Sequence, residues 1–216
     1  MRKITILMIL SVLLLNAFCQ NKGFLDYFPD IDKDTIVRTA QVQITYYKNF
    51  KESKFPVTFA LRYFFDNDIK KMYGEEEGYN VDDNTYIRIT YVKKVCPLFK
   101  KKNEDLYLLS YGIESILYLA IYDPKSDKIL STLVVSDFTD DLGNIVTHST
   151  IFPNNYIVTT QINEKTYHKL IKIDYNTQQF IELKKIESKN NMLEYEKQFE
   201  EAFSVLGITK KGELIE

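Results

Sequence analysis

Six short apolar runs between Ser115 and Leu183 constrain the fold more than any other feature of the chain. Turn-forming residues such as Asp123-Pro124 separate the runs, because Pro, Gly, Asn, Asp and Ser interrupt strands and favour tight reversals. A parallel crossover needs roughly a dozen residues or more, which these connections lack. The stretch therefore predicts an antiparallel meander. Its predicted strands are Ile116–Tyr122, Ile129–Ser136, Ile145–Phe152, Tyr156–Ile162, Tyr167–Ile173 and Gln179–Leu183.

The chain before the meander carries further strand patterns. Apolar residues alternate with polar ones along Ile36–Tyr47 and along Val57–Phe65, and this period of two is typical of half-buried strands. Pro97–Asn103 contains three consecutive lysines and predicts an exposed, basic turn. The remaining predicted elements in this part are strands at Thr85–Val92 and Leu106–Tyr111 and a short helix at Asp66–Tyr73.

A helix is predicted at the carboxyl end. Asn191 and Glu194 have the spacing of a capping box, and Gly207 is placed to end the helix. Apolar residues recur at helical spacing, which predicts a helix packed on the sheet; a partner-binding helix is the alternative. This stripe consists of Met192, Tyr195, Phe199, Ala202, Phe203 and Leu206.

Together these patterns predict a mainly β protein with one β-rich domain over residues 20–216. We expect an antiparallel meander curled into a sandwich or open barrel, with the carboxyl-terminal helix packed on it. An internal similarity links Ile121–Leu130 with Ile173–Glu182, 52 residues apart, and leaves partial β-propeller-like blades as the alternative. Two hairpins with the same turn chemistry are the simpler account, because stable arrays need about three repeats and no third copy occurs.

The amino terminus, residues 1–19, has the pattern of a signal peptide. Two basic residues precede the twelve-residue apolar run Ile4–Leu15, which is too short to span a bilayer. Cleavage between Cys19 and Gln20 is favoured, because Phe18 occupies a position where lipoproteins generally carry a small residue. A lipid anchor on Cys19 is the alternative. We therefore expect an exported protein, secreted or periplasmic, whose mature chain has no second apolar stretch long enough to span a membrane.

Charge and cysteine content limit the partners further. Cleavage leaves 26 basic and 30 acidic residues, a net charge of −4. A negative net charge does not favour binding to nucleic acid, so no such partner is expected. Cys96 is then the one remaining cysteine, so no internal disulfide is expected and the apolar core must stabilise the fold.

No catalytic, cofactor-binding or metal-binding residue is predicted. His148 and His168 are the two histidines, and neither has a second ligand at metal spacing. Nucleophile-elbow and nucleotide-loop motifs are absent from the sequence. Asp30, Asp32 and Asp34 alternate as in a calcium loop, but the required glycine and final acid are missing.

Three hypotheses about function remain. The first is a non-enzymatic exported protein of the cell envelope or exterior that binds an unknown protein or small-molecule partner. The second is a glycan hydrolase that uses two carboxylates, for which Glu114 and Asp137 flank one strand region without any motif to single them out. The third is a structural or assembly component of the envelope.

Overall fold

A computed structural model of the chain describes residues 22–42, 55–67, 69–70, 92–137, 147–162, 164–188 and 195–215. The predicted signal peptide, with Cys19 and Gln20, lies outside these residues. So do the predicted turn at 140–144, the predicted capping residues of the last helix and, apart from Val92, the predicted strand at Thr85–Val92.

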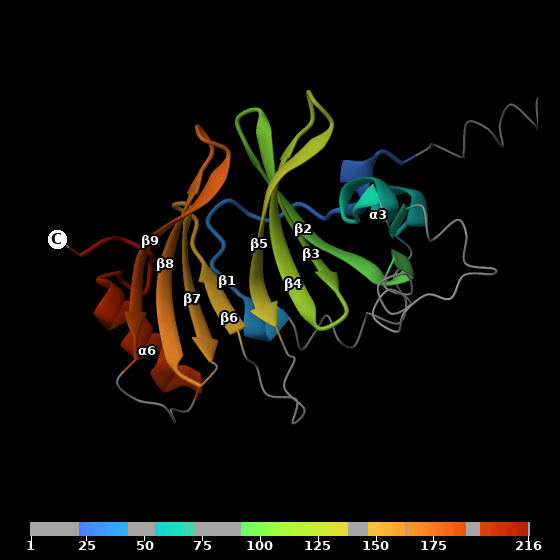
Figure 1. The fold of residues 1–216 in the computed structure, drawn as a ribbon. Helices are drawn as coiled ribbons and strands as arrows, with labels where there is room; N and C mark the ends of the chain where they lie inside the picture. Colours follow the sequence, from blue (N-terminus) through green and yellow to red (C-terminus); the bar gives the residue numbers. More distant parts are fainter. Residues whose placement is uncertain are drawn as a thin grey trace, which may run out of the picture.

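The core of the fold is one antiparallel sheet of nine strands that does not close on itself (Figure 1). Strands β2 to β9 lie side by side in chain order, and β1 pairs with β6. Among the described residues, β5 and β6 share a single register pair, Asp137 with Thr147, so the sheet divides into a first half, β2–β5, and a second half, β6–β9. The strands are β1 (Val37–Arg38), β2 (Val95–Asn103), β3 (Leu106–Ile113), β4 (Ile116–Asp123), β5 (Lys128–Asp137), β6 (Thr147–Ile151), β7 (Tyr156–Ile162), β8 (Thr166–Asp174) and β9 (Gln179–Glu187). The predicted antiparallel meander is confirmed.

Two hairpins in equivalent places of the two halves use the same turn. In the β4–β5 turn, Oδ1 of Asp123 accepts a hydrogen bond from the backbone N–H of Lys125 at 2.8 Å. In the β8–β9 turn, Oδ1 of Asp174 accepts one from the backbone N–H of Asn176 at 3.0 Å. Such self-bonding Asp side chains fix tight reversals. The internal similarity detected in the sequence therefore corresponds to two hairpins of one geometry.

The sheet curls so that side chains from both halves meet on its inner face. We call this set the inner cluster. It contains Val37, Phe99, Leu108, Leu117, Leu119, Ile121, Val135, Ile151, Ile157, Ile171 and Ile173. Each of these strands alternates inner and outer side chains, so a second apolar face remains to be covered on each half. The prediction of a meander curled into a sandwich or open barrel with a carboxyl-terminal helix is confirmed as a mainly β fold with one antiparallel sheet that does not close (Figure 1).

An aromatic cluster covers the outer face of the first half. The short helix η1 (Phe24–Tyr27) and helix α3 (Val57–Tyr63) supply side chains that pack against β3 and β4. The rings of Phe24 and Tyr63 lie 3.9 Å apart, and the rings of Phe64 and Tyr111 stack at 4.0 Å. The prediction of a strand at Val57–Phe65 was wrong. This short apolar run fits the period of two of a strand and also the period of 3.6 of a helix. As a helix it places Phe59, Ala60, Tyr63 and Phe64 towards the sheet.

Asp127 ties α3 to the β4–β5 turn. Its Oδ1 accepts hydrogen bonds from the hydroxyls of Tyr63 and Tyr122, each at 2.6 Å, and its Oδ2 pairs with Arg62. The hydroxyl donors hold the pKa of the Asp127 carboxyl below its usual range, whereas burial and the neighbouring carboxylate raise the pKa of both tyrosines. All of these shifts favour the same state, an ionised Asp127 with two neutral tyrosines, and that state locks the helix to the sheet.

The predicted long strand at Ile36–Tyr47 is also wrong for the part that the structure describes. Only Val37 and Arg38 pair in the sheet, and residues 39–42 form a helical turn. The cause lies at Thr39, whose hydroxyl donates to the carbonyl of Val135 at 3.2 Å and accepts from the backbone N–H of Ser149 at 2.8 Å. These side-chain bonds replace the ladder that a longer strand would need.

Pro97–Asn103 is not an exposed turn but most of β2. Proline is tolerated because β2 is a terminal strand of the sheet and is irregular between Pro97 and Phe99. The lysines of this run donate to carbonyls, Lys100 to Leu25 at 2.9 Å and Lys101 to Pro153 at 2.8 Å. Burial of its long stem lowers the pKa of Lys101.

Helix α6 (Tyr195–Leu206) covers the outer face of the second half, as predicted. Phe199, Ala202, Phe203 and Leu206 pack with side chains of β7 and β8; we call this set the helix cluster, completed by Phe152, Val158, Leu170 and Ile208. Gly207 follows the helix with a φ of +72°, a conformation that suits glycine at a helix end.

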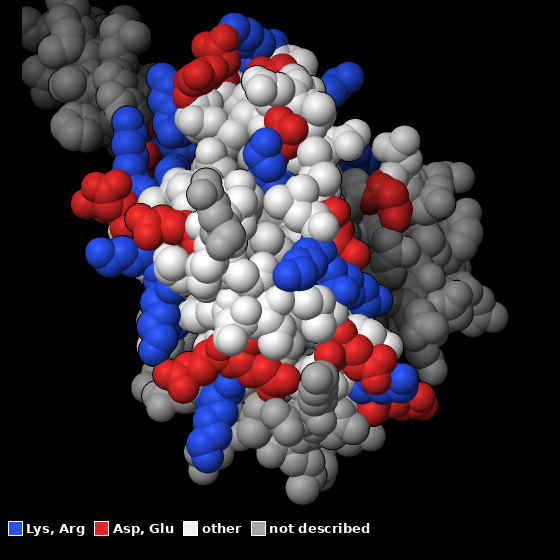
Figure 2. All heavy atoms as spheres, turned by 90° about the vertical axis from the view of Figure 1, so that its left-hand side faces the viewer, with Lys and Arg blue, Asp and Glu red and all other residues white. Residues whose placement is uncertain are grey.

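The face seen in Figure 2 shows how the terminal strand β9 meets solvent. Acidic and basic side chains are interspersed there among uncharged ones, with no field of one sign. β9 itself exposes Glu182, Lys184, Lys185 and Glu187. Charged residues on a terminal strand discourage pairing with another sheet edge.

Candidate functional site

A groove of about 610 Å³ lies between the amino-terminal segment, residues 29–42, and the first part of β2. Pockets for small ligands in proteins have volumes of roughly 300–1,000 Å³, so the groove is large enough to hold one. Its walls consist of Pro29, Asp30, Ile31, Thr35, Ile36, Val37, Arg38, Gln41, Val42, Cys96, Pro97, Leu98 and Phe99.

Backbone hydrogen bonds anchor the first wall at its beginning. The N–H of Lys100 donates to the carbonyl of Pro29 at 2.8 Å, and the N–H of Ile31 donates to the carbonyl of Lys100 at 3.1 Å. Asp30 thereby forms a parallel bridge with Lys100, on the side of β2 away from β3. This part of the segment acts as a short extra strand beside β2.

The same wall is anchored on the second half of the sheet at its other end. Val37 pairs with Ile151 and Arg38 pairs with Thr150, so β1 extends the sheet beyond β6. Thr39 adds its two side-chain bonds to β5 and β6. The segment therefore crosses from the outer edge of β2, where Asp30 pairs, to the edge of β6 that pairs with β1. The groove lies where the segment leaves β2.

The opposite wall is the first part of β2, whose sequence does not favour pairing with a further strand on this edge. Pro97 has no N–H to offer, and the strand is irregular just after it, so this part of β2 is a poor template for a further paired strand. The side chains of Cys96 and Leu98 instead pack partly against the inner cluster. The groove thus opens on the apolar interior between the two halves.

Most of the groove surface is apolar, with a few polar groups. Ile36 remains 39% exposed and Val42 is half-buried, so apolar surface is available to a ligand. Thr35, Gln41 and Asp30 supply a hydroxyl, an amide and a carboxylate. A mostly apolar wall with a few polar groups is the usual composition of a small-molecule site.

The thiol of Cys96 is not activated as a nucleophile. Burial raises its pKa, so the thiol stays protonated at neutral pH, and a protonated thiol reacts slowly. The geometry supports binding more directly than covalent catalysis.

Asp32 and Glu114, two of the acidic residues singled out in the sequence, make structural contacts. Oδ1 of Asp32 accepts from the N–H of Asp34 at 3.2 Å, which is turn chemistry at an exposed position. Glu114 lies in the β3–β4 turn and pairs with Lys94 at 2.6 Å, whereas Asp137 ends β5. Within the described stretches, no group of three or more His, Cys, Asp and Glu residues is placed to hold a metal ion.

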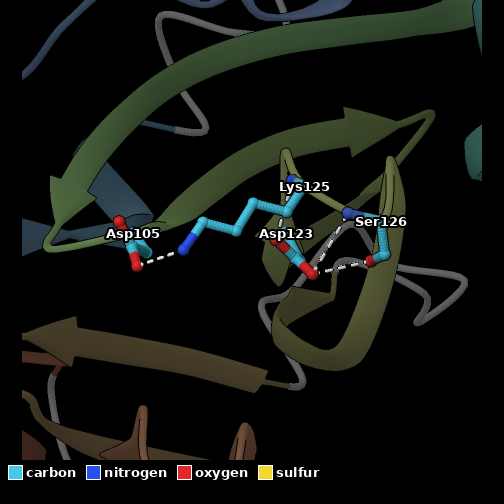
Figure 3. Close-up of polar contacts among 4 residues, drawn as sticks. All are labelled: Asp105, Asp123, Lys125 and Ser126. Carbon is cyan, nitrogen blue, oxygen red and sulfur yellow. Dashed lines mark hydrogen bonds and ion pairs between the residues drawn. The ribbon is translucent and has the colours of Figure 1, made fainter.

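A cluster of polar side chains lies in the turns at one end of the first half and is shown in Figure 3. Lys125 of the β4–β5 turn pairs with Asp105 of the β2–β3 turn, and Asp123 accepts from the hydroxyl of Ser126 at 2.7 Å. The hydroxyl and nearby backbone N–H groups lower the pKa of Asp123. Lys125 and Asp105 are more than two-thirds exposed, so these contacts order two hairpin tips and form no enclosed site.

His148 and His168 lie within strands, as predicted, but both are fully buried beneath α6. No motif in the sequence pointed to the groove, because its walls come from two separate stretches and contain ordinary apolar residues. The sequence did contain two relevant features, an apolar segment and a proline in a terminal strand, but neither of them identifies a ligand.

Among the described residues, no helix is both long enough and apolar enough to cross a membrane. Comparison of the chain with protein-family models, with curated proteins and with solved structures finds no match in any of the three.

Proposed function

We propose that the protein is an exported, non-enzymatic binding protein that holds an apolar ligand, or an apolar segment of a partner, in the groove between residues 29–42 and β2. The observation that carries the proposal is the 610 Å³ groove that opens on the inner cluster. Its residues include a single carboxylate, Asp30, whereas glycoside hydrolysis with two acids needs a pair. The export signal at residues 1–19 accounts for the location.

Binding is tested with the neutral dye N-phenyl-1-naphthylamine, whose fluorescence rises in apolar surroundings. The substitution Ile36→Glu places a charge on the groove wall, and we expect it to weaken dye binding by about tenfold or more, because burying a carboxylate in an apolar site is costly. Val134→Glu is the matched control: Val134 is 40% exposed, like Ile36 at 39%, but lies on β5 outside the groove. Equal dye affinities of the two variants would contradict the proposal.

Cys96 supplies an independent report from inside the groove. We expect saturating dye to slow alkylation of Cys96 by iodoacetamide, as followed by mass spectrometry of the peptide that contains it. Undiminished alkylation at saturation would mean that the dye binds elsewhere.

The export part of the proposal has its own test. We expect the exported product to begin at Gln20, as determined by intact mass, and to incorporate no labelled palmitate. A labelled Cys19 would replace plain cleavage with a lipid anchor, and an uncleaved chain in the cytosol would refute export.

A further inference from the structure

Two buried histidines lie in one row across the second half of the sheet. His148 of β6 is paired in register with Thr160 of β7, and Thr160 is paired with His168 of β8. Side chains in such a row point to one face of the sheet, and here that face is covered by α6. Both imidazoles are fully buried, at 0% exposure.

Helix α6 contacts this row directly. Nε2 of His148 lies 3.1 Å from Oε1 of Gln198, and the ring of His148 lies 4.7 Å from the ring of Phe199. Nδ1 of His168 lies 3.0 Å from the hydroxyl of Thr160. Nε2 of His168 has no hydrogen-bond partner among the described residues, so it has no described acceptor for a second proton.

The charged groups around the row offer little compensation for two added protons. Glu201 of α6 is the carboxylate that acts on His168, and its Oε1 already accepts from the hydroxyl of Ser188 at 2.8 Å. The guanidinium of Arg38 lies 5.7 Å from the centre of the Phe199 ring, so a cation is already present at this end of the helix. The remaining charged side chains described on α6 and β9 are all exposed: Lys197, Glu200, Glu182, Lys184, Lys185 and Glu187.

Burial keeps both imidazoles neutral. It lowers the pKa of His148 to about 4, with the neighbouring His168 acting in the same direction and Gln198 opposing. Burial also lowers the pKa of His168, against the opposing effect of Glu201. A histidine whose pKa is lowered by folding contributes stability above the pKa of the free side chain, about 6.5, and that contribution is lost as the pH falls towards the folded value.

We propose that the row of His148, Thr160 and His168 makes the docking of α6 acid-sensitive, so that acidification releases this helix from the sheet before the rest of the fold opens. The release exposes the apolar stripe of α6 and the face beneath it. The inference is independent of whether the groove binds a ligand.

Pulse-labelling hydrogen exchange of the full chain tests the proposal. The protein is equilibrated at pH 7.0 or pH 5.0 and then labelled briefly at one common pH, with the amides of α6 and of β3–β4 followed separately by mass spectrometry. From the pKa of about 4 for His148, we expect the open population of α6 to rise on the order of twentyfold at pH 5.0, while β3–β4 stays protected. No rise for α6, or an equal loss of protection in β3–β4, would overturn the proposal.

Matched variants identify the groups responsible. His148→Gln removes the titrating group, keeps a polar side chain and should remove most of the pH effect on α6, whereas Glu200→Gln changes an exposed acid of the same helix and should leave the effect intact. An unchanged pH effect in His148→Gln would contradict the proposal. Nuclear magnetic resonance titration of the wild-type imidazoles keeps the test decisive if the variant does not fold: a His148 that titrates near 6.5 while α6 remains protected would overturn it.

Discussion

Truncation of Leu119 tests the packing of the inner cluster. Leu119 lies in β4 between β3 and β5, is fully buried, and contacts side chains of the inner cluster. Leu119 lines neither the groove of about 610 Å³ nor a smaller cavity of about 10 Å³ beside the cluster, and its side chain is enclosed by other buried side chains. We therefore expect Leu119→Ala to lower the free energy of unfolding by about 3–4 kcal/mol, within the range measured for Leu→Ala changes in rigid cores.

Leu183→Ala is the matched control, because it deletes the same atoms from a side chain that is 48% exposed on β9. We expect it to change the free energy of unfolding by about 0.5 kcal/mol or less. Urea unfolding, followed by tyrosine fluorescence and far-ultraviolet circular dichroism, measures both values. Because the inner cluster joins the two halves, both signals should change in a single transition. A difference below about 1 kcal/mol between the two variants, or separate transitions, would refute the reasoning.

Three further substitutions test local features by thermal or urea unfolding. Gly212→Ala would place Cβ 2.5 Å from the ring of Phe152 at a φ of +90°, so we expect it to cost about 1–3 kcal/mol more than Gly207→Ala, where the nearest atom is 3.9 Å away; equal costs would contradict this contact. Asp127→Ala removes the acceptor that fixes α3 and should cost about 2 kcal/mol. It should also reduce the acid-induced loss of stability of the wild type, because a carboxyl whose pKa is lowered by folding contributes stability that is lost as it becomes protonated in acid. Lys125→Ala breaks an exposed pair and should leave the midpoint unchanged.

The meander was predictable because its strands and turns are both encoded locally. Each predicted run from Ile116 to Leu183 corresponds to a strand within a few residues, and Asp123 and Asp174 bond the backbone of their own turns. The helical stripe that ends at Gly207 was equally readable, because its period of 3.6 differs from that of the strands. Antiparallel order followed from the short connections.

The amino-terminal half was mispredicted because tertiary contacts decide its structure. Val57–Tyr63 is apolar enough to fit a strand, but as a helix it completes the aromatic cluster with Phe24 and Tyr111. Thr39 ends β1 by bonding to β5 and β6, which lie about a hundred residues further along the chain. Lys100 and Lys101 looked solvated in the sequence, yet their ammonium groups bond distant carbonyls.

The candidate site was beyond sequence reasoning for the same reason. Cys96 is half-buried, and its position in a groove depends on the segment that crosses from β2 to β6. The two histidines were correctly placed in strands, whereas their shared row depends on the register of β6, β7 and β8. Period-two patterns predict strands and do not fix which residues become neighbours.

Chemical-shift mapping with N-phenyl-1-naphthylamine tests the binding groove most directly. Backbone amide signals of the full chain are recorded by nuclear magnetic resonance as the dye is added. The structure predicts that the largest shifts fall on residues 35–42 and on Cys96, Leu98 and Phe99, the two walls of the groove. Shifts that concentrate on α6 and the helix cluster, or no shifts at all, would contradict a binding function for the groove.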